Sequence, residues 1–266
     1  MWIAQLSDLH LRTPGRLFWD RIDTNARLAR VFDFLALMRP RPELLLVTGD
    51  LTADDEPPAY AFLRAELERL AIRYLLLPGN HDSRVALRAA FPDQPWRSTE
   101  AGHLSYVVEL GGARLVMLDS LVEGEAYGAL GRGRRDWLET VLAAEGAPVI
   151  LAMHHPPLPL GLPYMDRLRL EDGETLARLV ARCRARLIAI LCGHLHRPVV
   201  TSFAGVPLVA APSTAFHCAP EMFEPVEEPA FLLDPPMFLL HQLTPEAELR
   251  SHLVVADSFP GPFRRR

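Results

Sequence analysis

The amino-acid sequence predicts a mixed α/β fold in which two sheets form the core and helices cover them. Residues 1–77 alternate apolar runs with stretches of helical periodicity in the order β-α-β-α-β, which is typical of parallel strands joined by helices. Two later pairs of apolar runs are each separated by a turn that contains glycine, which is typical of antiparallel hairpins. Parallel units and hairpins in one chain indicate mixed sheets.

The first part of the chain is expected to hold three strands and three helices. Residues 1–7 form an uninterrupted apolar run, which predicts a buried strand. Apolar residues recur at helical spacing over 25–38, and Thr24 is expected to be the N-cap of that helix. The elements expected next are a strand from Glu43, a helix over 59–70 opened by Pro57-Pro58, a strand over 73–77 and a short helix over 84–90.

The middle of the chain is expected to be rich in strands. Gly111-Gly112 separates two apolar runs and predicts a hairpin, and Ala204-Gly205 predicts a second hairpin in the same way. The elements expected here are strands over 104–110 and 114–118, a helix over 131–144, a strand over 149–153, a helix over 176–183, and strands over 187–192, 199–203 and 206–210.

We expect a catalytic domain over 1–210 and a C-terminal extension over 211–266. Prolines recur between Pro212 and Pro245 and are expected to break up any long element in the extension. Apolar residues persist there, so the extension is not a disordered tail. We expect it to form a lid over the main domain or a contact between the copies of a homo-oligomer.

The composition excludes several classes of function. All 28 basic residues are arginine, which rules out a P-loop lysine or a lysine Schiff base. The net charge of −5 gives no sign of a groove for nucleic acid. The cysteines form no Cys-x-x-Cys pair. No apolar run approaches the ~20 residues that span a bilayer, and no leader precedes the first strand, so we expect a cytoplasmic protein without a membrane partner.

Metal-binding residue types follow five of the apolar runs. Because such runs read as buried strands, we expect their ends, and the side chains that follow them, to meet at one shared edge of the sheets. The five segments are Asp8-Leu9-His10, Gly49-Asp50, Gly79-Asn80-His81-Asp82, His154-His155-Pro156 and Gly193-His194-Leu195-His196.

The spacing of these residues indicates two metal ions rather than one. Residues two apart on a strand share a face, so Asp8 and His10 can bind one ion, as can His194 and His196. Imidazole and oxygen ligands together suit Zn, Mn, Fe or Co. One ion cannot use every donor, whereas two ions ~3.5–4 Å apart and bridged by a carboxylate can. Asp50 follows a glycine and is the carboxylate left free to bridge.

Two such ions indicate hydrolysis of a phosphate ester. They would bind the non-bridging oxygens and acidify a water that attacks phosphorus in line. His81 follows the amide ligand Asn80 and has a pKa class suited to a proton donor near neutral pH, so it is the candidate acid for the leaving alcohol. Asp82 is expected to orient His81 or to cap the following helix.

Alternative interpretations remain for single residues. An Asp-x-His pair is common by chance, and Asn-His-Asp after glycine can be a simple turn, so the joint occurrence of the five segments is what supports a site. Phe18 and Trp19 either stack on a substrate or pack within their own loop. His217 either lines the pocket or has a structural role.

The five segments together resemble the signature of the calcineurin-like metallophosphoesterases, over roughly residues 3–200. Within that superfamily, the Ser7–Arg12, Phe18–Asn25 and His154–Pro159 stretches are similar to the bacterial glycerophosphodiesterases and class III cyclic nucleotide phosphodiesterases. The resemblance implies a four-layer αββα sandwich of two mixed sheets, with metals at the strand ends and a C-terminal lid or dimer contact.

The resemblance also implies a role for each residue of the site. The first metal would be held by Asp8, His10, Asp50 and His196, and the second by Asp50, Asn80, His154 and His194. His81 would donate a proton or stabilise the transition state. The ligand of this family lies two residues before the proline, which selects His154, and His155 would then face the substrate or support the ligands.

The leading hypothesis is a dinuclear-metal phosphodiesterase for small diesters, such as glycerophosphodiesters or 3′,5′-cyclic nucleotides. A nuclease or phosphomonoesterase of the same superfamily is the alternative, although a nuclease would need a basic groove and the chain is acidic. A non-catalytic metal-binding scaffold is a third hypothesis. Such a scaffold should have lost some ligands, whereas the set here is complete.

Overall fold

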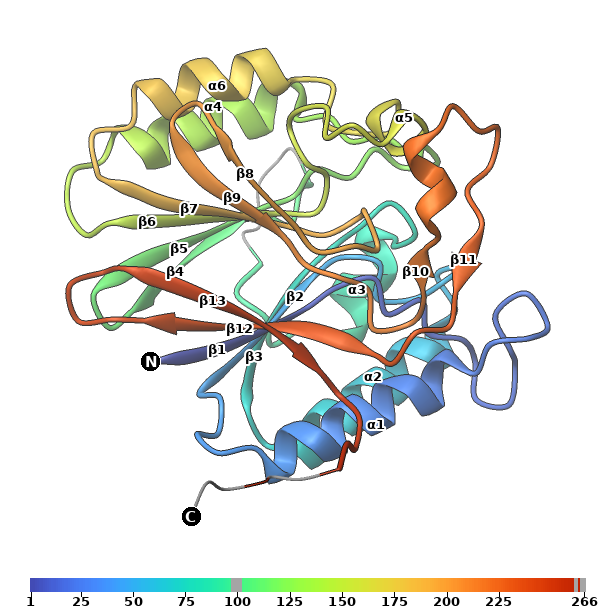
Figure 1. Ribbon diagram of the computed structural model, residues 1–266. Helices are drawn as coiled ribbons and strands as arrows, with labels where there is room; N and C mark the ends of the chain where they lie inside the picture. Colours follow the sequence, from blue (N-terminus) through green and yellow to red (C-terminus); the bar gives the residue numbers. More distant parts are fainter. Residues whose placement is uncertain (97–101, 261–262, 264–266) are drawn as a thin grey trace.

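The protein, seen in a computed structural model that describes residues 1–96, 102–260 and 263, folds into four layers (Figure 1). One helical layer covers the first sheet, the two sheets pack face to face, and a second helical layer covers the other sheet. The first helical layer consists of α1 (Thr24–Leu37), α2 (Pro57–Leu70) and the short α3 (Arg84–Ala90), and the second of α4 (Gly131–Ala143) and α6 (Gly173–Ala181). The expected mixed α/β sandwich is therefore confirmed.

The first sheet has five strands in the order β13-β12-β1-β2-β3. Its strands are β1 (Trp2–Leu6), β2 (Leu44–Thr48), β3 (Arg73–Leu77), β12 (Met237–Leu243) and β13 (Leu249–Val255). β1, β2 and β3 are parallel, with Ile3 opposite Leu44 and Leu44 opposite Arg73. β12 is antiparallel to β1, and β13 is antiparallel to β12.

The second sheet has six strands in the order β4-β5-β6-β7-β9-β8. Its strands are β4 (Tyr106–Leu110), β5 (Ala113–Leu118), β6 (Val149–Met153), β7 (Leu187–Cys192), β8 (Val199–Phe203) and β9 (Val206–Ala210). β5, β6, β7 and β9 are parallel, and β4 and β8 close the two edges through the predicted antiparallel hairpins.

The central strands are uninterrupted apolar runs because both of their faces are buried. In β2 every residue is buried; Leu45 and Val47 pack against the helices, whereas Leu44 and Leu46 pack against the second sheet. This is the pattern expected of a parallel strand inside a layered fold. The packing fixes the register of β2, because a shift by one residue would exchange the two faces.

The start of α1 differs from the prediction. Asp23, and not Thr24, is the N-cap: its carboxylate accepts a hydrogen bond of 2.9 Å from the backbone N–H of Ala26. The hydroxyl of Thr24 instead donates to the carbonyl oxygen of His10 at 2.8 Å. Thr24 thereby ties α1 to the loop that follows β1.

The segment after residue 210 contributes to two parts of the molecule. The expectation that prolines would break up long elements is wrong for 237–255, where β12 and β13 are seven-residue strands of the first sheet. They form because the prolines fall outside both strands, where no ladder hydrogen bond is lost. A small sheet of β10 (His217–Cys218) and β11 (Phe231–Leu232) and the 3₁₀ helix η1 (Pro220–Phe223) lie on the same side of the molecule as α5 (Pro163–Asp166) (Figure 1).

In the ranges that the structure covers, we find no helix with both the length and the apolar character needed to cross a bilayer.

Candidate metal centre

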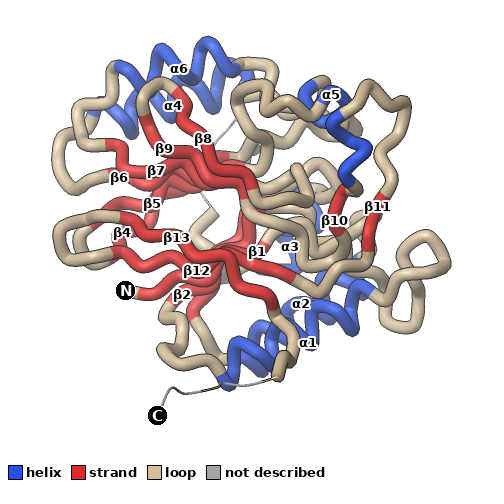
Figure 2. The backbone as a smooth tube through the Cα atoms, in the orientation of Figure 1, coloured by secondary structure: helices blue, strands red, loops and turns tan. Residues whose placement is uncertain are grey.

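The predicted ligands lie together where the parallel strands end. Figure 2 shows that the loops after these strands gather on one side of the molecule, next to β10 and β11. Asp8 and His10 follow β1, Asp50 follows β2, Asn80 and His81 follow β3, His154 follows β6, and His194 and His196 follow β7. The donors come from both sheets, so the packing of the two sheets determines the distances between them.

One group of donors matches the set implied for the first metal. The ligand atoms of Asp8, His10, Asp50 and His196 lie within 4.8 Å of one another, and all four residues are buried. The Nε2 atoms of His10 and His196 are 3.0 Å apart. His10 Nε2 lies 3.6 Å from Asp50 Oδ2, and His196 Nε2 lies 3.7 Å from Asp8 Oδ1. Two imidazoles and two carboxylates therefore converge on one point.

A second group lies on the other side of Asp50. His154 Nε2 is 3.1 Å from Asn80 Oδ1 and 3.4 Å from Asp50 Oδ1. His194 Nδ1 is 3.0 Å from the same amide oxygen of Asn80. Asp50 therefore turns Oδ1 to this group and Oδ2 to the first group. A carboxylate with one oxygen toward each donor set has the geometry needed to bridge two ions.

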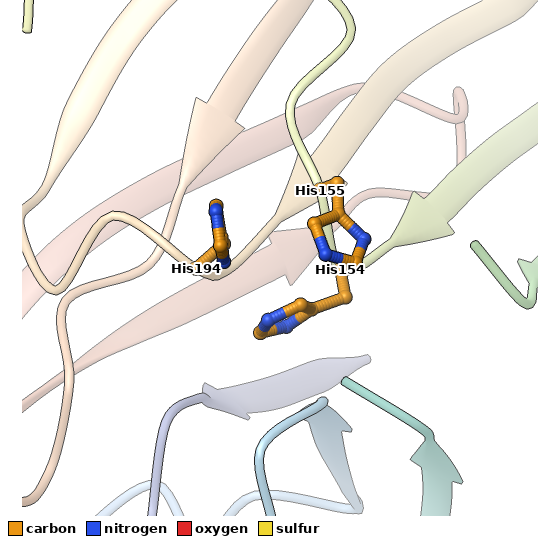
Figure 3. Close-up of side chains that lie close together, drawn as sticks. All are labelled: His154, His155 and His194. Atoms are coloured by element: carbon orange, nitrogen blue, oxygen red, sulfur yellow. The ribbon is translucent and has the colours of Figure 1, made fainter. Parts of the chain in front are cut away.

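His155 belongs to a cluster of three imidazoles but lies behind the cavity. Its ring is perpendicular to that of His154 and 4.7 Å from that of His194 (Figure 3). Its Nδ1 lies 2.8 Å from the hydroxyl of Ser120, and its side chain is fully buried. Two roles were expected for His155, to face the substrate or to support the ligands. Because His155 does not line the cavity, its position fits support of the ligands and not contact with the substrate.

Backbone carbonyls orient two of the imidazoles. His154 Nδ1 lies 2.7 Å from the carbonyl oxygen of Thr48, and His196 Nδ1 lies 3.0 Å from that of Phe216. A carbonyl oxygen only accepts, so each Nδ1 carries the proton and each Nε2 presents its lone pair to the other donors. Metal-binding histidines are commonly oriented in this way.

Five residues of the site have backbone conformations that residues other than glycine rarely adopt. Asp8, His10, Asp50, His194 and His196 all have positive φ angles, between 44° and 71°. Such residues are uncommon outside glycine and gather at functional sites, where the surrounding structure holds them.

Two glycines are required by close approach. A Cβ at Gly79 would lie 2.2 Å from Asp50 Oδ1 and 2.3 Å from the Asp50 backbone nitrogen. A Cβ at Gly193 would lie 1.9 Å from the hydroxyl oxygen of Ser7 and 2.9 Å from the carbonyl oxygen of Thr48. Both glycines therefore allow the loop ends to approach closely enough to assemble the donors.

The electrostatics of the donors fit divalent cations. Burial raises the pKa of Asp8 to about 7, and the nearby Asp50 adds to the increase. Burial also opposes ionisation of Asp50, but His154 and other imidazoles outweigh it and keep the pKa of Asp50 well below its usual range. The pKa of His154 is raised to about 9 by Asp50 despite burial. Bound cations would compensate these buried carboxylates and would release the proton of His154.

His81 lies at the rim of the donor sets and lines the cavity. Its Nδ1 is 2.9 Å from the carbonyl oxygen of Ala53, so Nδ1 carries a proton and Nε2 is free to face the cavity. Its backbone N–H donates to Asp50 Oδ1 at 2.9 Å. Its ring is 4.7 Å from that of His10. His81 is thus adjacent to the metal donors while its own ring nitrogen bonds elsewhere.

Asp82 neither orients His81 nor caps the next helix, contrary to both expectations. It accepts hydrogen bonds from the hydroxyl of Tyr60 and from the backbone N–H groups of Gly79, Leu51 and Thr52. The N-cap of α3 is Ser83. Asp82 therefore joins the loop after β2 to the loop after β3, and so fixes the positions of Asp50 and Asn80.

A cavity of about 580 Å³ opens over the donors. Phe18 and Trp19 line it, as do Phe216 and Phe231, which the sequence did not single out. His217 does not line it: the side chain lies with its Nδ1 3.8 Å from Asp234 Oδ2. The alternation of sides along β10 explains the difference, because the neighbours of His217 face the cavity instead.

Comparison with known proteins identifies the family of this chain. The family model described as calcineurin-like phosphoesterase matches residues 1–198. The chain belongs to the calcineurin-like phosphoesterase family. It is 31% identical over 265 residues to a probable glycerophosphodiester phosphodiesterase, GpdQ, of Arcobacter nitrofigilis, covering 99% of this chain and 96% of the relative.

Other calcineurin-like relatives carry related names. The chain is 34% identical over 244 residues to the glycerophosphodiester phosphodiesterase GpdQ of Enterobacter lignolyticus, covering 91% of this chain and 87% of that protein. It is 31% identical over 220 residues to the 3′,5′-cyclic adenosine monophosphate phosphodiesterase CpdA of Pseudomonas aeruginosa, covering 82% and 78% of the two chains.

Solved structures share the calcineurin-like fold. A dimetal phosphatase from Danio rerio aligns with a TM-score of 0.68 at 14% identity, over 94% of this chain and 98% of that chain. A purple acid phosphatase from yellow lupin aligns with a TM-score of 0.71 at 13% identity, over 96% of this chain and 51% of that chain. At such low identity these alignments support the fold alone.

Proposed function

We propose that the protein is a dinuclear-metal phosphodiesterase that hydrolyses small phosphodiesters, such as glycerophosphodiesters or 3′,5′-cyclic nucleotides. The observation that carries this proposal is the position of Asp50, whose two carboxylate oxygens face separate donor sets beneath one cavity. The names of the relatives agree with it. A complete donor set disfavours the non-catalytic scaffold.

The donor sets would hold two divalent cations. Asp8, His10, Asp50 and His196 would hold one, and Asp50, Asn80, His154 and His194 would hold the other. When bound, the cations supply Lewis acidity that polarises the phosphate and acidifies water. Imidazole and oxygen donors without thiolates suit Mn, Fe, Zn or Co.

His81 is the proposed general acid. In hydrolysis the oxygen of water forms a new bond to phosphorus, the bond from phosphorus to the leaving alcohol breaks, and that alcohol needs a proton. Because Ala53 fixes the proton on Nδ1 of His81, the imidazolium form carries its second proton on Nε2, toward the cavity. Burial opposes that form, but Asp50 and the bond to Ala53 outweigh burial and raise the pKa of His81.

Three further expectations belong to this proposal. We propose that the C-terminal extension forms a lid or a contact between the copies of a homo-oligomer, and that the enzyme acts in the cytoplasm on a small molecule rather than on nucleic acid. β10 and β11 contribute Cys218 and Phe231 to the cavity lining, which supports the role of a lid.

A substrate panel with added manganese tests the proposal. The purified protein is assayed with glycerophosphoethanolamine, 3′,5′-cyclic AMP, a phosphomonoester, and DNA and RNA. We expect hydrolysis of small diesters, loss of activity with EDTA, and loss of activity in the variant Asp50→Asn. The variant Asp33→Asn, exposed on α1 and outside the cavity lining, is the matched control and should keep activity. Exclusive monoesterase activity would reject the proposal, and cleavage of nucleic acid alone would support the nuclease alternative.

A further inference from the structure

Four aromatic side chains form one wall of the cavity, and we refer to Phe18, Trp19, Phe216 and Phe231 as the aromatic wall. Their rings contact one another. The ring centroids are 4.4 Å apart for Phe18 and Trp19, 5.0 Å for Trp19 and Phe231, and 4.9 Å for Phe216 and Phe231. The rings thus form a continuous surface.

The aromatic wall begins at the metal donors and ends at the cavity mouth. The ring of Phe216 lies 5.2 Å from that of His10 in a stacked arrangement and 4.6 Å from that of His196. Phe18 and Phe216 are buried, whereas Trp19 is 54% exposed and Phe231 is half-buried. Trp19 and Phe231 therefore present the accessible part of the wall. A group attached to a phosphate at the metal donors would lie within reach of it.

The rest of the cavity lining is partly apolar and partly charged. Tyr164 and Met165 of α5, together with Leu168, supply further apolar surface. The charged lining comes from residues of several loops and includes Arg12, Asp54 and Glu228. The cavity therefore combines an apolar aromatic surface with polar groups, as small-molecule sites do.

The shape of the aromatic wall distinguishes between three kinds of substrate alcohol. A polyol would lose hydrogen bonds to water against apolar rings without replacing them. A quaternary ammonium group is bound most strongly where several rings surround it, whereas these rings pack against one another and form no such cage. A planar ring can stack on the face of one exposed ring and contact the neighbouring rings, which are tilted against it.

We infer that the aromatic wall binds a planar ring carried by one alcohol of the diester, so that the preferred substrates are nucleotide diesters. Trp19 and Phe231 are the specificity-determining residues. This inference rests on the proposed phosphodiesterase activity and narrows its substrate class. It assigns no part of the wall to the chemical step, because none of the four rings carries a group that transfers a proton near neutral pH.

Three diesters with the same leaving group test the inference. Each is a 2,2,2-trifluoroethyl ester, of thymidine 5′-monophosphate, of methyl phosphate or of phosphocholine, so the bond that breaks is chemically equivalent, the leaving group carries no planar ring, and only the retained alcohol differs. Rates are measured with the manganese-loaded, full-length protein. We expect kcat/KM for the nucleoside ester to exceed that for the methyl ester by roughly 10-fold or more, mainly through a lower KM.

Variants of Trp19 and Phe231 test whether the aromatic wall causes the preference for the nucleoside ester. Trp19→Ala and Phe231→Ala should each bring the ratio of nucleoside to methyl ester toward one, whereas Trp19→Phe should retain most of it. Leu233→Ala is the control, because Leu233 is 57% exposed and lies outside the cavity lining. That variant should keep the full ratio. Taking ratios removes any general effect of a substitution on folding or on metal content.

Three results would overturn the inference. Hydrolysis of all three esters at similar rates would leave the proposed function intact and reject the planar-ring site. A preference for the phosphocholine ester would assign the wall to an ammonium group instead. Hydrolysis of none of the esters would reject the proposed function and the inference with it.

Discussion

At the scale of single residues, the candidate site depends on histidines in which a backbone carbonyl holds one ring nitrogen and leaves the other ring nitrogen for the site. His81 shows what this allows: its Nδ1 bonds to the carbonyl of Ala53, so its other nitrogen can act in the cavity without disturbing the metal donors. We expect His81→Ala to lower kcat by roughly 10²–10⁴-fold for alkyl diesters, which have poor leaving groups.

The same variant has an internal control. A p-nitrophenyl diester needs little protonation of its leaving group, so its rate should fall much less in His81→Ala. Metal content, measured by plasma emission spectroscopy, should stay at the wild-type value. An equal loss for both kinds of ester would contradict the role as an acid and would indicate a role in binding.

The variant Gly79→Ala tests the close approach of two loops. The added methyl would lie 2.2 Å from Asp50 Oδ1 and 2.3 Å from the backbone nitrogen of Asp50, and the backbone cannot yield cheaply. We expect manganese affinity, measured by titration calorimetry, to fall roughly 10–100-fold. Gly111→Ala is the control, since no atom lies within 4 Å of its added Cβ. Equal affinities in the two variants would show that the contact is unimportant.

The sequence revealed the donors but not the surface around them. Asp8, Asp50 and His154 could be predicted because each follows an apolar strand, and strand ends of a parallel sheet meet in space. Phe216 and Phe231 could not, because their segment has no periodicity and the pairing of β10 with β11, which places Phe231 opposite Cys218, leaves no signal in the sequence. The role of Asp82 could not be predicted either. Its carboxylate accepts hydrogen bonds from backbone N–H groups of two loops, and the pattern of side chains in a sequence does not show where those groups lie.

At the scale of elements, a buried polar chain connects the two sheets behind the metal donors. The Gln5 amide on β1 donates to the hydroxyl of Thr48 on β2 at 3.1 Å and to the carbonyl of Cys192 on β7 at 2.9 Å. His241 on β12 donates from Nε2 to the side-chain amide oxygen of Gln5 at 2.9 Å, and its Nδ1 accepts from the hydroxyl of Ser251 at 2.7 Å. The chain spans both sheets, so it helps to set their separation.

Because it contains His241, this buried hydrogen-bonded network makes the free energy of unfolding depend on pH. Burial lowers the pKa of His241 to about 3, against an ordinary value of 6.5. Between these two values the unfolded chain binds a proton at this residue and the folded chain does not. The free energy of unfolding therefore falls as the pH is lowered through this window, by at most about 1.4 kcal/mol per pH unit.

The variant His241→Gln removes that titration while keeping a donor and an acceptor. Urea unfolding between pH 7 and pH 5 should give a shallower dependence on pH than in the wild type. The exposed His252, on the adjacent strand β13, provides the control variant His252→Gln, which should change the slope much less. Parallel curves for wild type and His241→Gln would contradict the assignment.

Most elements could be predicted because their periodicity is local. β12 and β13 were missed because the prolines around them suggested an irregular segment, and because β1, the strand that joins β12 to the sheet, lies more than 200 residues earlier in the chain. Pairing over that distance leaves no local signal. The short α5 was missed for a related reason, since a helix of four residues has no measurable period.

At the scale of the whole molecule, the position of β12 determines where the chain can be shortened. β12 pairs with β1 between β13 and the rest of the first sheet, so its removal would expose the edge of β1. A chain that ends at Pro236 should be insoluble or unfolded, whereas one that ends at Ala256 should fold. Circular dichroism and size-exclusion chromatography would distinguish them. A folded, monodisperse product of the shorter chain would show that 237–256 is dispensable.

Metal removal tests whether the site also joins the two sheets. β1, β2 and β3 of the first sheet and β6 and β7 of the second all carry donors, so bound cations would hold the layers together. A ligand at 100 times its Kd stabilises the folded state by about 2.7 kcal/mol, which corresponds to a rise in Tm on the order of 5–10 °C for a chain of this size.

We therefore expect manganese to raise Tm over that in EDTA by this amount, as measured by differential scanning calorimetry. The variant Asp50→Asn removes the carboxylate that both donor sets share, so manganese should raise its Tm far less. Asp54→Asn, at the cavity rim, should respond like the wild type. An equal rise in Tm for Asp50→Asn would mean that the stabilising ions bind elsewhere, because Asp50 turns one carboxylate oxygen toward each donor set.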